Sequence, residues 1–174
     1  LLVCNHLSYL DIIALSSLQP CVFVAKRDVR AWPLFGWLAR AGGTIFVQRN
    51  SRLAAPTEIS QIREAIEAGL LVVLFPEGTS SDGATVLPFK SSLLQAAVSS
   101  GCPIAPAGIT YHLSRGSVAN EVCYWRDMTL VPHLLNLFGK SHIESTIRFS
   151  SPKPYISDRK ALARVLRAEV AILT

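Results

Sequence analysis

Residues 70–83 read LLVVLFPEGTSSDG, and this stretch decides the class of fold. Its first six residues are all apolar, which is typical of a β-strand buried on both faces. Residues 57–68, just before it, form a predicted helix, because Ile59, Ile62 and Ile66 fall on one face and Gly69 supplies a stop signal. A helix that leads directly into a buried strand indicates an α/β architecture.

The rest of the chain continues this alternation of strands and helices. Apolar runs predict further strands at residues 1–4, 21–25, 45–47, 104–111 and 146–149. Residues 91–99 form another predicted helix, and Asp158 is expected to cap a last one, in which Leu162, Leu166, Val170 and Leu173 form one stripe. No linker, repeat or low-complexity segment interrupts the pattern, so we expect a single domain over residues 1–174.

The composition indicates a chain that is deeply buried or faces lipid. The 174 residues are 50% hydrophobic and 17% charged, with a net charge of +5 and a mean hydropathy of +0.35. An ordinary soluble domain has about 25% charged residues, and these values exclude a disordered or collagen-like chain. No stretch is apolar for long enough to predict a transmembrane helix. Since Leu1 already lies in a predicted strand, we expect a fragment of a longer protein that lacks an upstream membrane-associated segment.

Four cysteines, Cys4, Cys21, Cys102 and Cys123, show neither C-x-x-C spacing nor a histidine at zinc-finger distance. We therefore expect four reduced thiols that act as small buried apolar residues, and neither a disulfide scaffold nor a metal site.

A histidine and a carboxylate, His6 and Asp11, follow the first predicted strand. On a regular helix their side chains would point about 140° apart, so they meet only if His6 lies in the turn and Asp11 lies in the first helical turn. In that geometry Asp11 accepts the proton of one imidazole nitrogen and leaves the other free as a general base. The alternative is a structural one, because Ser8-x-x-Asp11 also fits the pattern of a helix start whose carboxylate serves only backbone N–H groups.

The turn after the buried strand is the second candidate site. Pro76 ends the strand, Gly78 allows an unusual backbone conformation, and Thr79 offers a hydroxyl group. Sites in α/β sheets lie beyond the carboxyl ends of strands, where a buried Glu77 would need a partner. The alternative is a polar loop with Glu77 exposed.

Four ordered blocks of the sequence resemble the glycerophospholipid acyltransferase family, which contains the lysophosphatidic acid acyltransferases. The blocks are Asn5-His6-x-x-x-x-Asp11, GTIFVQR at residues 43–49, FPEGT at 75–79 and PIAP at 103–106. The resemblance covers residues 1–111 and implies a central mixed, mostly parallel β-sheet flanked by helices. It implies that His6 is the general base and Asp11 its partner, and that Arg49, Glu77, Gly78 and Thr79 bind the acceptor. Pro103 and Pro106 fit either the floor of the site or plain core packing.

The same resemblance implies the reaction. An acyl group would pass from acyl-CoA or acyl carrier protein to the hydroxyl of a lysophospholipid such as 1-acyl-glycerol-3-phosphate, without a covalent acyl-enzyme, a metal or a further cofactor. This chain has Ser80 where many members have arginine. Either Arg49 suffices alone, or Arg52 or Lys26 compensates, or the acceptor is another lipid such as a lyso-ornithine lipid. Two other classes stay open, a thioesterase or hydrolase and a non-catalytic lipid-binding module.

Residues 26–52 carry the whole excess of positive charge, six basic residues against Asp28, interleaved with Trp32, Phe35 and Trp37. This pattern favours an anionic membrane surface, the phosphates of CoA or an acidic carrier protein. A solvated basic face with structural tryptophans is the alternative, and nucleic acid lacks a supporting motif. We expect a peripheral membrane protein on the cytoplasmic face. The apolar residues 128–139 fit core packing, an acyl pocket or lipid contact, and the sequence suggests no partner for His112, His133 or His142.

Overall fold

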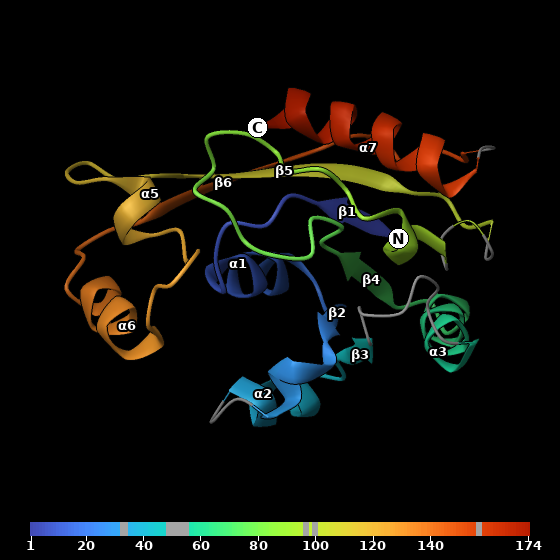
Figure 1. Cartoon of the computed structure of the whole chain (residues 1–174), viewed down its shortest axis with the longest axis horizontal. Coiled ribbons are helices and arrows are strands. Elements are labelled where there is room, and N and C mark those ends of the chain that lie inside the picture. Colours follow the sequence, from blue (N-terminus) through green and yellow to red (C-terminus); the bar gives the residue numbers. More distant parts are fainter. Residues whose placement is uncertain (32–34, 48–55, 96–97, 99–100, 156–157) are drawn as a thin grey trace.

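The computed structural model describes all residues except 32–34, 48–55, 96–97, 99–100 and 156–157 (Figure 1). Its strands are β1 (Leu2–Cys4), β2 (Cys21–Lys26), β3 (Ile45–Val47), β4 (Leu71–Leu74), β5 (Ala105–His112) and β6 (Glu144–Phe149). Its α-helices are α1 (Leu10–Leu18), α2 (Phe35–Ala41), α3 (Pro56–Glu67), α5 (Val118–Glu121), α6 (Leu130–Phe138) and α7 (Arg159–Leu173). Two 3₁₀ helices, η1 (Arg27–Ala31) and η2 (Ser91–Leu94), complete the described elements.

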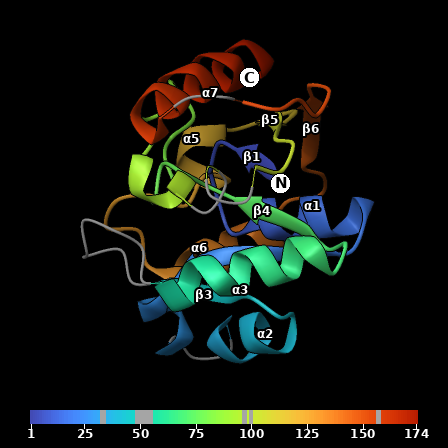
Figure 2. The same cartoon turned by 90° about the vertical axis from the view of Figure 1, so that its right-hand side faces the viewer.

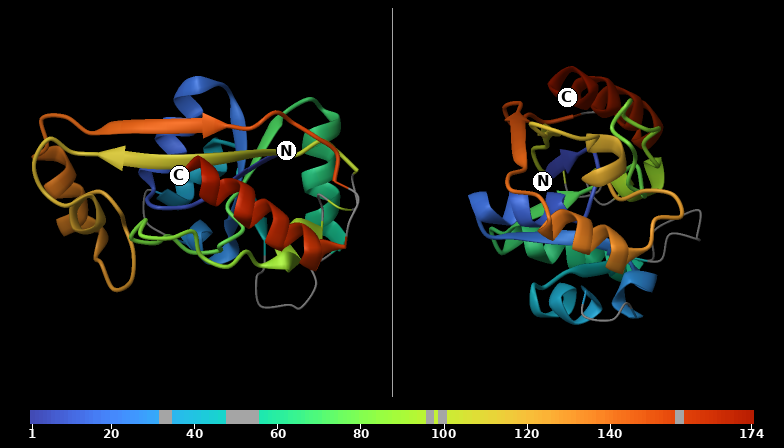
Figure 3. Two further views of the ribbon diagram at one scale, coloured as in Figure 1. Left: turned by 90° about the horizontal axis from the view of Figure 1, so that it is seen from above. Right: turned by 90° about the vertical axis from the view of Figure 1, so that its left-hand side faces the viewer.

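The strands form one six-stranded sheet in the order β3-β2-β4-β1-β5-β6. Neighbours from β3 to β5 pair in parallel, and only β6 is antiparallel, against β5. In Figure 3 the long β5–β6 pair runs side by side and reaches toward α6. The predicted mixed, mostly parallel sheet flanked by helices is confirmed.

Helices cover both faces of the sheet. Leu162, Leu166 and Val170 of α7 join Ile62 of α3 in a core against one face, and Leu15 of α1 packs in a second core on the other face. In Figure 2, α7 lies at the top and α2 at the bottom, with the sheet between them. The central strands β1 and β4 are therefore buried on both sides, and for β4 this is what the run LLVVLF predicts.

The local predictions hold except over residues 91–99, and the structure adds helices that the sequence pattern does not predict, among them α5. The predicted helix over residues 91–99 begins as the 3₁₀ helix η2 and not as a regular α-helix, and Gln95 and Val98 are helical. Residues 96–97 and 99–100 lie outside the described residues. The helices η1 and α2 occupy the basic, aromatic segment, and α6 occupies the apolar segment 128–139, where the sequence pattern predicts no element. Pro132 is tolerated in α6 because it stands in the first turn, whose N–H groups need no helical partner. Asp158 caps α7 as expected, accepting from the backbone N–H groups of Lys160 and Ala161.

Candidate active site

Three neighbouring strands bring two predicted site residues, His6 and Glu77, and one that the sequence did not indicate, Tyr111, to one end of the sheet. β1 lies between β4 and β5, and all three run in parallel, so their carboxyl ends meet at the same edge. His6 follows β1, Glu77 follows β4, and Tyr111 lies near the end of β5. Asn5 extends the β1–β5 ladder with its side chain, which accepts from Ile109 N at 2.8 Å and donates to Ile109 O at 2.9 Å. The turn that carries His6 is thereby anchored.

His6 and Asp11 meet in the predicted way. Asp11 stands in the first turn of α1 and is fully buried, and its Oδ2 lies 2.7 Å from His6 Nδ1. Because a buried carboxylate only accepts, Nδ1 carries the proton and Nε2 carries the lone pair. Nε2 has no hydrogen-bond partner among the described residues, and the His6 side chain is 23% exposed. Nδ1 is thus held by Asp11, and Nε2 is available to accept a proton from a substrate.

Asp11 also serves the backbone of the turn. Its Oδ2 accepts from Leu7 N at 2.7 Å and from Ser8 N at 3.1 Å. The Ser8 side chain caps nothing, and its buried hydroxyl has no partner in the described part of the chain. Asp11 therefore accepts from backbone N–H groups, as the structural alternative predicts, and it also accepts from the imidazole, which that alternative does not include.

Glu77 is buried, which excludes an exposed polar loop. The side chain is 1% exposed, its Oε1 accepts from His6 N at 2.8 Å, and its Oε2 accepts from Leu87 N at 2.8 Å. Burial raises the pKa of the Glu77 carboxyl above its ordinary value, and the two backbone N–H groups oppose that rise. Glu77 thus fixes the backbone of His6 rather than contacting its ring.

The aromatic ring of Phe75 completes the support of His6. The two rings stack with centroids 4.3 Å apart and planes 17° from parallel, and Phe23 stacks on Phe75 from β2. With Asp11 on Nδ1 and Glu77 on the backbone, the orientation of the imidazole is fully determined. Such a ring is preorganised for proton transfer at Nε2.

The glycine of the turn is needed for its conformation and for space. Gly78 has φ +74°, and a Cβ atom there would lie 2.9 Å from Nζ of Lys90. Lys90 is therefore a cation beside the turn that no short sequence pattern could reveal, 12 residues after Gly78. Thr79 is exposed next to it, and Ser80 donates its hydroxyl to the Tyr124 carbonyl, so Ser80 ties the turn to the segment before α6.

The basic residues of the acceptor blocks are not all described. Arg49 and Arg52 lie outside the described residues, as does the whole link from β3 to α3, residues 48–55. Trp32 lies outside them as well. Lys26 is the last residue of β2, and nothing is described of its side chain. An open hollow of about 370 Å³ contains Arg27 and Arg30 with Thr44, Thr57 and Gln61, but none of His6, Asp11 and Glu77 lines it.

A second histidine lies near the site, and the sequence suggested no partner for it. His133 of α6 is buried, its Nε2 donates to the Cys123 carbonyl at 3.0 Å, and its Nδ1 accepts from the Tyr9 hydroxyl at 2.8 Å. Burial lowers the pKa of His133, and burial beside Tyr124 raises the pKa of Tyr9 to about 12. His112 and Glu144 form a loose exposed pair at 3.9 Å.

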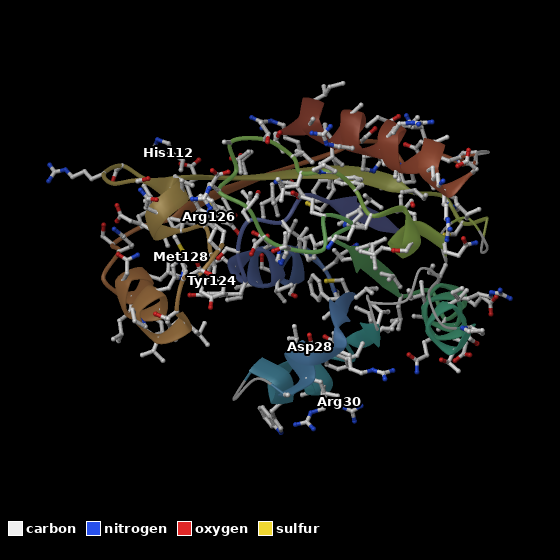
Figure 4. All side chains as sticks on the ribbon, in the orientation of Figure 1. Asp28, Arg30, His112, Tyr124, Arg126 and Met128 are labelled. Atoms are coloured by element: carbon white, nitrogen blue, oxygen red, sulfur yellow. The ribbon has the colours of Figure 1, made fainter. Side chains whose placement is uncertain are left out.

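The outer face of α6 is not part of the core. Val131, Leu135 and Phe138 fall on one stripe and are 65%, 65% and 76% exposed. Core packing is thus wrong for these three residues, although Leu137 and His133 on the other side of the helix are buried. Figure 4 shows Tyr124, Arg126 and Met128 gathered at the end that carries α5 and α6, whereas Asp28 and Arg30 lie at the end with η1 and α2.

Two negative findings concern the part of the chain that the structure describes. No three His, Cys, Asp or Glu side chains there are close enough together to hold a metal ion. None of the helices in that part has both the length and the apolar character to cross a membrane. None of the four cysteines, all of which are described, forms a disulfide; Cys4 and Cys123 are buried as expected, and Cys21 and Cys102 are only half-buried.

Comparison with known proteins decides the family. A family model described as Acyltransferase matches residues 1–110, which contain all four sequence blocks. The chain belongs to the glycerophospholipid acyltransferase family. The lyso-ornithine lipid O-acyltransferase of Brucella abortus is 37% identical over 187 residues, covering 99% of this chain and 70% of the relative. That of Rhizobium meliloti is 36% identical and covers 95% of this chain.

Two further relatives are less similar to this chain. The 1-acyl-sn-glycerol-3-phosphate acyltransferase of Neisseria gonorrhoeae is 32% identical over 75% of this chain. The crystal structure of the 1-acyl-sn-glycerophosphate acyltransferase from Thermotoga maritima superposes with a TM-score of 0.62 at 24% identity, covering 99% of this chain and 65% of that one, which shows the fold. The chain spans 62% of the length of the Rhizobium relative and 54% of the Neisseria relative.

Proposed function

We propose that this acyltransferase-family chain moves a fatty acyl group from a thioester donor, acyl-CoA or acyl carrier protein, to the hydroxyl of a lysolipid. The observation that carries the proposal is the state of His6. Its Nδ1 is held at 2.7 Å by a fully buried carboxylate, while its half-buried ring leaves Nε2 without a partner among the described residues. An imidazole in this state is a general base aimed at an incoming proton donor.

The reaction follows from that geometry. Nε2 of His6 takes the proton of the acceptor hydroxyl while the oxygen of that hydroxyl attacks the thioester carbonyl carbon. The new C–O ester bond forms, the C–S bond breaks, and the proton passes from Nε2 to the departing sulfur, which leaves as a thiol. The carboxylate of Asp11 keeps its hydrogen bond to Nδ1 and stabilises the imidazolium, while its oxygens also accept from Leu7 N, Ser8 N and the Tyr111 hydroxyl.

The neighbouring groups have supporting roles in this proposal. Glu77 holds the backbone of His6 and so fixes the height of the ring over the site. Gly78 and Thr79 contact the acceptor headgroup, and Lys26 and Arg49 supply positive charge for its anionic group. Arginine is suited to that role because its planar donors bind a phosphate or carboxylate with two hydrogen bonds.

Two acceptors are candidates, and a specific observation favours the second. The first is 1-acyl-glycerol-3-phosphate, which has a phosphomonoester headgroup. The second is a lyso-ornithine lipid, which the names of the two more similar relatives describe as their substrate. Ser80 supports the second acceptor, since it replaces a cationic residue and its hydroxyl is already bonded to the Tyr124 carbonyl.

The test is a panel of acceptors offered to the purified chain with labelled acyl-CoA or acyl carrier protein, and the products are resolved by mass. We expect a new ester with one of the two lysolipids, formed about 10³-fold more slowly by His6→Ala. Free fatty acid with no ester would instead indicate a hydrolase that activates water. Binding of lipid without any turnover would indicate a non-catalytic module.

We also propose that the chain works as a peripheral protein at the cytoplasmic face of a membrane, where lysolipids reside. The exposed stripe Val131, Leu135 and Phe138, the 62% exposed Trp37 and the net charge of +5 support this location. Co-sedimentation with anionic vesicles is expected to weaken in Leu135→Ser. The control is Ile172→Ser on α7, where the side chain is 83% exposed on another helix, and equal loss in both variants would contradict the proposal.

A further inference from the structure

The buried carboxylate of Asp11 uses its two oxygens differently. Oδ2 accepts from His6 Nδ1, Leu7 N and Ser8 N, all within 3.1 Å. Oδ1 accepts from one described group only, the hydroxyl of Tyr111 at 2.7 Å. Tyr111 stands 100 residues away in the chain, near the carboxyl end of β5. The parallel pairing of β1 with β5 brings it to the same edge of the sheet as His6.

The Tyr111 hydroxyl can only be a donor in this place. Burial and the neighbouring Asp11 carboxylate raise the pKa of Tyr111 far above its ordinary value, so the phenol stays protonated. Its half-buried ring packs against the core that contains Leu15 of α1, and this packing holds the hydroxyl against Oδ1. A hydrogen bond from a neutral donor to a buried charge is among the stronger ones in proteins.

We propose that Tyr111 is a positioning residue that extends the His6–Asp11 pair to a third member and sets how strongly Asp11 attracts the proton on His6. This inference rests on the proposed function of His6 as the base. By donating to Oδ1, Tyr111 keeps the carboxylate from rotating and draws negative charge away from Oδ2. Asp11 then orients the imidazole without trapping it in the protonated state.

The other titratable groups around the pair leave Tyr111 as the group to test. Glu77 faces His6 from the turn after β4, but both of its oxygens are bound to backbone N–H groups. Cys4 on β1 and Cys123 face Asp11, and burial raises the pKa of both thiols, that of Cys123 to about 12. Both thiols are therefore neutral at the pH of the reaction, and neither is bonded to Asp11 in the described structure.

The experiment compares two tyrosines that each donate to a carboxylate. Tyr111→Phe removes one hydroxyl and keeps the ring, and we measure kcat, KM for the lysolipid and the pH dependence of kcat/KM. We expect kcat to fall about tenfold and KM to stay unchanged. We also expect the acidic limb of the profile to move to higher pH. Without the hydrogen bond from Tyr111, Oδ2 of Asp11 carries more negative charge and holds the proton on His6 more tightly. The control is Tyr155→Phe, since Tyr155 donates to Glu169 of α7 and is expected to leave all three quantities unchanged.

A second replacement keeps the proposal testable if the phenylalanine variant folds poorly. Fluorinated tyrosine at position 111 is a stronger donor, so the acidic limb is expected to move to lower pH, opposite to the phenylalanine variant. If the acidic limb of the kcat/KM profile stays at the same pH in both variants, the proposal is overturned and Tyr111 is a structural residue. If His6→Ala itself retained full activity, the proposed function would fail instead, so the two failures are distinguishable.

Discussion

The turn around His6 and the segment around His133 use the same side chain for different purposes. The two regions are in contact, because Tyr9, three residues after His6, donates its hydroxyl to Nδ1 of His133. His6 bonds through one nitrogen to an ionised carboxylate and is 23% exposed. His133 bonds through both nitrogens to neutral groups, a hydroxyl and a carbonyl, and is 6% exposed.

The difference shows what separates a candidate base from a structural histidine. A base needs a free nitrogen, a path to solvent or substrate, and a partner that stabilises its protonated form. His6 meets all three conditions, and His133 meets none of them, since protonation would place a second N–H against the Tyr9 hydroxyl in a buried site. His133 instead connects α6 to the start of α1, so it belongs to the scaffold.

The strongest test of this contrast is a pair of alanine variants. His6→Ala is expected to reduce kcat about 10³-fold with little change in the melting temperature, because a general base contributes about 10²–10⁴-fold. His133→Ala is expected to keep kcat within about tenfold and to lower the free energy of unfolding by about 2–3 kcal/mol, through a cavity and two unpaired polar groups. Acyl-transfer kinetics and denaturant unfolding measure both. Equal kinetic losses in the two variants would remove the distinction.

Asp11→Asn separates the role of the partner from that of the base. An amide keeps the shape but has one acceptor oxygen, while the carboxylate serves the His6 ring, two backbone N–H groups and the Tyr111 hydroxyl. We expect kcat to fall roughly 10²-fold, since the imidazolium loses its negative partner and His6 loses its fixed tautomer. The variant should also unfold more easily, because an N–H group then faces other donors. A variant with full activity would show that Asp11 only fastens the turn.

The sequence predicts those parts of this site that depend on local pattern. The run LLVVLF predicts β4 as a buried strand. The spacing of His6 and Asp11 predicts a turn followed by a helix, since their side chains meet only in that arrangement. Tyr111, Lys90 and His133 were missed for one physical reason. Their contacts depend on strand order, on the path of a loop and on how α6 docks, none of which leaves a trace in neighbouring residues.

The exposed stripe of α6 was ambiguous for a related reason. An apolar helix face has the same sequence pattern whether it faces a core, a lipid or another protein. Only the fold shows that His133 and Leu137 point inward while Leu135 and Phe138 point outward. The basic segment 26–52 stayed open as well, because its charges are compatible with several anionic partners.

The pH dependence of stability gives a finer test of the His133 region. Burial lowers the pKa of His133 in the folded protein, whereas the unfolded chain takes up the proton near the ordinary value of about 6.5. The unfolded state therefore binds more protons below this pH, and stability should fall as the pH drops from about 6.5 toward the lowered pKa. Melting temperatures from pH 8 to pH 5 should show a steeper fall for the native chain than for His133→Ala. Parallel curves would mean that another group is responsible.

The smallest effect is expected for Asp158 on the opposite face of the sheet. Its variant is the control for the variants of His6 and His133. Asp158 caps α7 through Lys160 N and Ala161 N, and these hydrogen bonds lower the pKa of its carboxyl. The cap is therefore present above the ordinary pKa and is lost only as the pH falls through the lowered value, so Asp158→Ala should lower the melting temperature slightly at neutral pH and not at strongly acidic pH. Because α7 packs in the core opposite to α1, acyl transfer and its pH profile should be unchanged. A change in kcat here would mean that loosening the scaffold anywhere slows the reaction, and the losses in His133→Ala could then no longer be assigned to its own contacts.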